Sequence, residues 1–157
     1  MPSGERRSLK EFPSECLNVD LEIKSRSNPA LLIRAWNRRV MQMHSNKLGR
    51  RHWVRVMLWP QPSNPNEALR RFARLVRGLP ASARTVWDNA SKELDIGIQA
   101  GLEQRSGEWV IDAAVAEMVG QLGASIRLTI YSPWEQIRDR SKTRRRLSAK
   151  SQHSTSK

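Results

Sequence analysis

Apolar and polar residues alternate in four stretches of the chain with the two-residue period of a strand that buries one face. The clearest stretch is residues 93–101 (ELDIGIQAG), and the same period occurs in residues 18–25, 51–59 and 124–132. Residues 51–59 carry apolar side chains on both sides, so the second face of this strand is either covered by another segment or open to a partner. The pattern predicts four strands, with residues 93–101 in the centre of a sheet.

Between these stretches, apolar residues recur every three or four positions, which is typical of helices with one buried side. The predicted helices cover residues 30–44, 65–77, 83–90 and 112–122. Asn64 followed by Pro65 and Glu67 forms an N-terminal capping pattern for the second of them, and Gly123 follows the last.

The order of these elements predicts an α+β fold, because strand, helix, strand occurs twice along the chain. Two such βαβ halves form a ferredoxin-like sandwich, here with a helical insertion over residues 65–91 between the halves. In that arrangement the strands at 18–25 and 93–101 are central antiparallel neighbours. The strand at 124–132 then flanks the first of them, and the strand at 51–59 flanks the second.

The predicted domain covers residues 18–133, with a segment of different character at each end. Residues 1–17 mix charged residues, proline and glycine without a period, which indicates a loose arm. Residues 134–157 are rich in basic residues, serine and threonine, and cannot bury a core, which indicates a disordered basic tail.

The net charge is the largest departure from an ordinary composition. The chain has 28 Lys and Arg against 15 Asp and Glu, which gives +13. Such a charge suggests an anionic partner, either nucleic acid, an acidic protein or a membrane surface. No apolar run approaches the roughly 18 residues that a membrane span needs, so we expect no membrane insertion. The single cysteine, Cys16, and the lack of a leader pattern predict a cytoplasmic protein.

Four segments together resemble a known family. They are ARTVWDNASKELDIGIQAG, GQLGASIRLTIYSP, DLEIKS and NEALRRFARLVRGLP, and they lie within residues 18–133. They are similar to an uncharacterised bacterial family that is catalogued only as a domain of unknown function. The resemblance implies a small bacterial α+β domain. Some relatives lie near toxin and immunity genes, which implies protein binding, and the family has no active-site motif to carry over.

Three carboxylates, Asp20, Glu22 and Asp95, are predicted to gather on one face of the sheet. Clustered carboxylates can bind a hard divalent cation or act in acid–base catalysis. The alternative is that each pairs with a basic residue predicted beside it on a neighbouring strand, and the sequence favours this pairing. These basic residues are Lys24, Arg55 and Arg127.

Other signals of catalysis are missing from the sequence. The three histidines and Cys16 have no zinc-ligand spacing, and no phosphate-binding loop or nucleophile elbow occurs. The sequence therefore predicts a protein that is not an enzyme and needs no cofactor or metal.

Two sets of residues are candidates for binding. Tryptophan residues that are hard to bury, together with a methionine, suggest an interface for a protein partner or a second copy, unless other segments cover them. Arginines on helix faces and in the tail suggest contacts with a phosphate backbone. The first set is Trp53, Met57, Trp59 and Trp134; the second is Arg34, Arg38, Arg70, Arg74, Arg77, Arg144, Arg145 and Arg146. The sequence thus favours a non-catalytic binding protein of the immunity or accessory kind, with sequence-independent nucleic-acid binding as the alternative.

Overall fold

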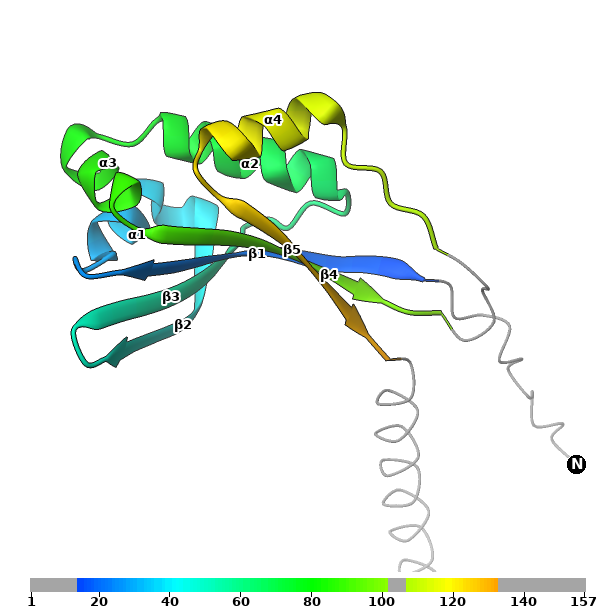
Figure 1. The fold of residues 1–157 in the computed structure, drawn as a ribbon, viewed down its shortest axis with the longest axis horizontal. Coiled ribbons are helices and arrows are strands. Elements are labelled where there is room, and N and C mark those ends of the chain that lie inside the picture. Colours follow the sequence, from blue (N-terminus) through cyan, green and yellow to red (C-terminus); the bar gives the residue numbers. More distant parts are fainter. Residues whose placement is uncertain (1–13, 102–106, 133–157) are drawn as a thin grey trace, which may run out of the picture.

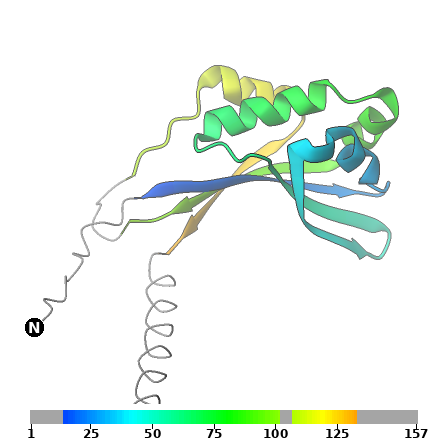
Figure 2. The ribbon, with the colours of Figure 1, turned by 180° about the vertical axis from the view of Figure 1, so that it is seen from behind.

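The computed structural model describes residues 14–101 and 107–132, and within them a sheet is covered on one face by helices (Figure 1). The view from behind shows the helices on the same side of the sheet, so the domain has two layers (Figure 2). We call the face without helices the open face. The elements are β1 (Glu15–Ser25), α1 (Ala30–Trp36), η2 (Asn37–Arg39), β2 (Val40–Leu48), β3 (Arg51–Leu58), α2 (Pro65–Arg77), α3 (Ala81–Asp88), β4 (Ser91–Gln99), α4 (Ala113–Gln121) and β5 (Ser125–Tyr131).

The sheet has five strands in the order β2-β3-β1-β4-β5, and all neighbours are antiparallel except β4 and β5. The α+β class and the central antiparallel pair, β1 and β4, agree with the prediction. The ferredoxin-like arrangement is not confirmed, because the flanking strands are exchanged: β3 pairs with β1, and β5 pairs with β4. The additional strand β2 reverses the chain once more, so β3 returns antiparallel to β1.

The predicted helix over residues 30–44 was wrong in its second half, where β2 forms instead. The apolar residues Leu32, Trp36 and Val40 are four positions apart, and this spacing fits a helix but also the alternation of a strand. At Asn37 the backbone has a φ of 50° and a ψ of −132°, which lies outside the helical region and ends α1. Gly49, with a φ of 59°, then lies in the turn between β2 and β3.

The other predicted elements have the correct type, and their ends differ from the structure by at most three residues. The cap of α2 is as predicted, since the Asn64 side chain accepts hydrogen bonds from the N–H groups of Asn66 and Glu67. Of the predicted arm, the part from Glu15 onward is the start of β1. The rest of the arm and the basic tail lie outside the described residues, apart from Ser14.

Two tryptophans join the helices above the sheet. Trp36 and Trp87 are 1% and 2% exposed, as expected for core residues, and their rings meet edge to face with centroids 6.1 Å apart. The Trp36 indole N–H donates to the carbonyl oxygen of Leu75 in α2, and that of Trp87 donates to Leu122, just after α4. These bonds satisfy the buried indole nitrogens and connect α1 with α2, and α3 with the end of α4.

Gly97 lies on the open face, where neighbouring side chains leave no room for a Cβ atom. β1 has a bulge between Cys16 and Asn18, and Asn18 is opposite Gly97 across the β1–β4 pair. A Cβ atom at Gly97 would lie against the Asn18 side-chain oxygen and 3.3 Å from the ring of Tyr131. Glycine in this strand is therefore needed for the close approach of a neighbouring side chain.

We predict that Gly97→Ala lowers the free energy of unfolding by about 1 kcal/mol, because the new methyl group displaces the Asn18 amide from its hydrogen bond to Asp20. Urea unfolding measures this change. Gly120→Ala is the control, since a Cβ atom at this position in α4 meets nothing within 4 Å. It should raise stability by about 0.5–1 kcal/mol. Equal changes for the two variants would contradict this packing.

Candidate functional site

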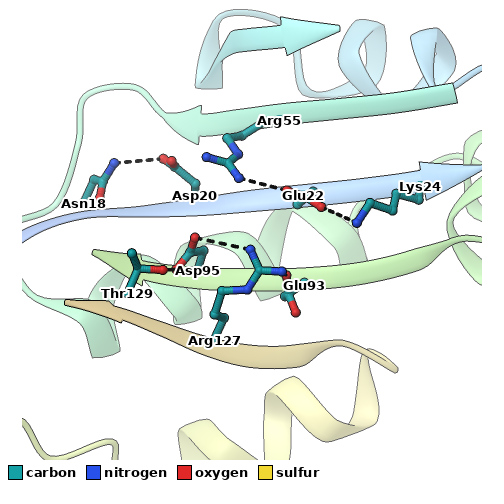
Figure 3. A network of polar contacts seen from close by, with 9 residues as sticks. All are labelled: Asn18, Asp20, Glu22, Lys24, Arg55, Glu93, Asp95, Arg127 and Thr129. Atoms are coloured by element: carbon teal, nitrogen blue, oxygen red, sulfur yellow. Dashed lines mark hydrogen bonds and ion pairs between the residues drawn. The ribbon is translucent and has the colours of Figure 1, made fainter. Parts of the chain in front are cut away.

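A band of polar side chains crosses the centre of the open face, from β3 through β1 and β4 to β5 (Figure 3). Its three central carboxylates are buried although none of the described helices covers this face: Asp20, Glu22 and Asp95 are 9%, 6% and 7% exposed. The complete set in the figure is Asn18, Asp20, Glu22, Lys24, Arg55, Glu93, Asp95, Arg127 and Thr129. Buried carboxylates need partners, so their contacts decide what the band can do.

Glu22 is held between two basic side chains. Arg55, its register partner on β3, donates to one carboxylate oxygen at 2.9 Å, and Lys24 donates to the other at 2.7 Å. Burial alone would raise the pKa of Glu22, but hydrogen bonds from Lys24 and Arg55 lower it to about 2. Glu22 therefore stays ionised and acts as a structural anion.

Asp95 has partners on β5. The Thr129 hydroxyl donates to it at 2.6 Å, and the Arg127 guanidinium lies 3.8 Å from its second oxygen. Arg127 also contacts the carboxylate of Glu93. Glu22 and Asp95 thus pair with the basic residues that were expected, but two partners are exchanged relative to the predicted strand order: Arg55 pairs with Glu22 on β1, and Arg127 pairs with Asp95 on β4.

Asp20 is the least compensated of the three carboxylates. It accepts one hydrogen bond, at 3.3 Å from the Asn18 amide, and is the register partner of Asp95 on β4. Burial raises the pKa of Asp20, and the charge of Asp95 adds to the rise, whereas Arg55 and His44 oppose it. Within residues 14–101 and 107–132, no three His, Cys, Asp or Glu side chains gather closely enough to hold a metal ion.

The predicted aromatic interface is only partly brought together. Trp53 is half-buried, with the His44 ring stacked parallel to it at 6.0 Å and the Arg55 guanidinium 5.8 Å from its ring centre. Met57 is also half-buried, whereas Trp59, just beyond β3, is 56% exposed. Trp134 lies outside the described residues. Of this set, Trp59 offers the most surface to a partner.

Sequence reasoning missed an apolar row on β5. Ile126, Leu128 and Ile130 are 37%, 60% and 69% exposed, although they are in register with buried residues of β4 and share their side of the sheet. β5 begins beneath α4 and then runs away from the helices (Figure 1), so exposure increases along the strand. The alternation of residues 124–132 resembles that of a half-buried strand and contains no signal of this exposure.

The predicted arginines of the helices are all exposed. Arg70 is engaged with the Asp112 carboxylate, whereas Arg74 lines a hollow of about 240 Å³ together with Arg39 from η2 and Arg71. Arginines from separate elements therefore meet, but two of these three were not among the predicted set. That set also contains Arg34, Arg38 and Arg77 on the surface, and Arg144, Arg145 and Arg146 outside the described residues.

Comparisons with protein-family models, curated proteins and solved structures find no match. Among the described helices, none is long and apolar enough to cross a membrane. The fold alone defines the class of this protein, which is a two-layer α+β domain with a mixed sheet. What the domain does must be argued from its surface.

We predict that Glu22→Gln lowers the free energy of unfolding at pH 7 by about 1–3 kcal/mol, because it leaves Arg55 without its charged partner. The pKa of Glu22 in the fold, about 2, lies below its ordinary value of 4.5. The ionised form thus stabilises the fold fully above pH 4.5, and this stabilisation is lost as the pH falls toward 2.

Urea unfolding of both proteins at pH 7 and at pH 3 tests this dependence, and the difference between them should shrink at the lower pH. Glu117→Gln is the matched control, since Glu117 is exposed on α4 and forms no ion pair with a described residue; its carboxylate accepts a hydrogen bond from the Gln121 amide. A Glu22→Gln effect that is the same at both pH values would rule out this role for the ion pair.

Proposed function

We propose that this chain is a non-catalytic protein-binding domain, of the immunity or accessory kind that the family resemblance implies, and that it binds an acidic protein through β5. The observation that carries the proposal is the row of Ile126, Leu128 and Ile130, which is exposed on a strand at the edge of the sheet. An apolar row beside an open sheet edge is a typical docking site for an extended strand of a partner.

The charges near β5 favour an incoming apolar strand. Arg127 is the only charged residue of β5, and it already contacts Glu93 and Asp95 on the open face. The face of β5 that carries the isoleucines therefore has no charge of its own. A partner strand paired along the β5 edge could pack apolar side chains against this face without leaving a charged group unpaired.

The net charge favours an acidic partner over a second copy. Two chains that each carry +13 repel one another, whereas an acidic protein is attracted and its association is accelerated. The surface around Met57 and Trp59 is a second place where the same domain could bind, because Trp59 is exposed and the adjacent Met41 of β2 is 39% exposed.

A photo-crosslinking residue at position 130 in the full chain, introduced in the native cells, identifies the partner; position 85, exposed on α3, serves as the control. We predict that the purified partner binds the wild type and that Leu128→Thr/Ile130→Thr weakens binding at least about tenfold, since burial of each aliphatic side chain contributes roughly 1.5–3 kcal/mol. Threonine retains the preference for a strand.

Two comparisons make the binding result specific. Val110→Thr removes apolar surface from a side chain that is 66% exposed outside the sheet, and it should leave the dissociation constant unchanged. Trp59→Ala reports on the second surface. If only Trp59→Ala weakens binding, β5 is not the interface. If light scattering shows a dimer that Leu128→Thr/Ile130→Thr dissociates, β5 binds a second copy instead.

Sequence-independent nucleic-acid binding is the second candidate function, and the convergence of Arg39, Arg71 and Arg74 favours it. None of these side chains forms an ion pair with a described residue, and no carboxylate lines their hollow. Arg71 donates to the carbonyl oxygen of Pro60, which positions it at this site. Three guanidinium groups without an ion-pair partner among the described residues suit the phosphates of a nucleic-acid backbone.

We predict for this second function that the full chain binds a labelled DNA duplex and a labelled RNA with affinity that falls steeply as salt rises. Arg71→Gln/Arg74→Gln should reduce the slope of log K against log[salt] by about 1–2, since each phosphate contact contributes about one unit. Lys47→Gln/Arg50→Gln makes the same change of charge in the β2–β3 hairpin, where both side chains are exposed and line neither this hollow nor those at Lys24 and Arg51. If both double variants reduce the slope equally, the hollow is not a specific phosphate site.

A further inference from the structure

Two hollows meet where β1 ends and β3 and β4 begin, and they share the side chains of Lys24 and Arg51. The first hollow has a volume of about 560 Å³, and the second has about 380 Å³. The first is also lined by Ser25, Arg26, Ser27, Asn89 and Ser91. The second is also lined by Glu22, Asn46, Leu48, His52 and Trp53.

The first hollow has the chemistry of an anion site. Its lining includes Lys24, Arg26 and Arg51 but no carboxylate. Lys24 is shared with Glu22, whereas Arg26 and Arg51 form no ion pair with any residue in the described part of the chain. Guanidinium groups bind phosphate through paired hydrogen bonds, so two free ones beside an ammonium group suit a phosphate.

A buried hydroxyl group supports this assignment. Ser25 is 3% exposed, and its oxygen accepts a hydrogen bond from the N–H of Ser27. Its own hydrogen has no acceptor among the residues that the structure describes. A phosphate oxygen in the hollow would accept from this hydroxyl, and Ser27 and Ser91 line the same space.

The second hollow is suited to an apolar or aromatic group. Leu48, which is 67% exposed, and Trp53 provide apolar surface, and the Asn46 amide and the His52 ring provide hydrogen-bonding groups. Because Lys24 and Arg51 border both hollows, a ligand with its phosphate in the first would extend its remaining part along the second.

We propose that this end of the sheet binds a phosphate monoester that carries an aromatic group, with a nucleoside monophosphate as the class to test. The phosphate lies against Arg26, Arg51 and Ser25, and the base lies against Leu48 and Trp53. The site uses no residue of β5 and no residue of the Arg39, Arg71 and Arg74 hollow. Its test is therefore separate from those of the two proposed functions.

Calorimetric titration of the full chain with AMP, adenosine and inorganic phosphate tests the proposal. We expect AMP to bind at least about tenfold more tightly than either fragment, because only AMP fills both hollows. Arg51→Gln should weaken AMP binding at least about tenfold through the loss of the paired hydrogen bonds. Arg77→Gln has the same change of charge on α2, outside both hollows, and should leave the dissociation constant unchanged.

Thermal unfolding of each variant confirms that the fold is intact before binding is compared, and Arg51 is exposed, so its replacement should not disturb the core. If phosphate alone binds as tightly as AMP, the aromatic half of the proposal is wrong. If Arg51→Gln and Arg77→Gln weaken AMP binding equally, the attraction is a general effect of net charge. Absence of binding at millimolar AMP would overturn the site altogether.

Discussion

The antiparallel pairing of β1 with β4 is the constraint on which the rest of the structure depends. It places Leu21 opposite Leu94 on the side of the helices, and Asp20 opposite Asp95 on the open face. The first pair starts the core. The second puts two carboxylates side by side in a poorly hydrated place, where an unpaired charge costs several kcal/mol. The flanking strands supply the compensation: Arg127 on β5 pairs with Asp95, and the charge of Arg55 on β3, which pairs with Glu22, opposes the rise in the pKa of Asp20.

This compensation explains which part of the site could be predicted from the sequence. Residues two apart on a strand share a face, so the alternation of 18–25 and 93–101 was enough to place Asp20, Glu22 and Asp95 together and to expect basic partners. The basic residues were identified correctly, but the predicted order of the flanking strands was wrong, so Arg55 and Arg127 were assigned to the wrong central strands. Arg55 pairs with Glu22 on β1, whereas the predicted order had put its strand beside β4.

The fold was harder to predict from the sequence where one pattern of apolar residues fits both a helix and a strand. Leu32, Trp36 and Val40 satisfy both a helix and a strand, and only the backbone at Asn37 decides between them. The exposed row on β5 is a different case, since the strand was predicted correctly. Whether Ile130 is covered depends on where α4 ends relative to β5, which is a property of the packed domain. The hollows at Lys24 and Arg51 likewise combine residues from three separate parts of the chain.

The ion pairs on the open face also determine where the excess positive charge lies. Lys24, Arg55 and Arg127 are committed to the buried carboxylates, so the centre of the sheet is nearly neutral despite its many charged groups. Arginines with no carboxylate beside them lie instead at the end of the sheet, as Arg26 and Arg51 do, and beside α2, as Arg39 and Arg74 do. An anion has no reason to bind the most highly charged band of the molecule. Its binding is favoured at the margins of the sheet, where arginines without a carboxylate partner line hollows in the surface.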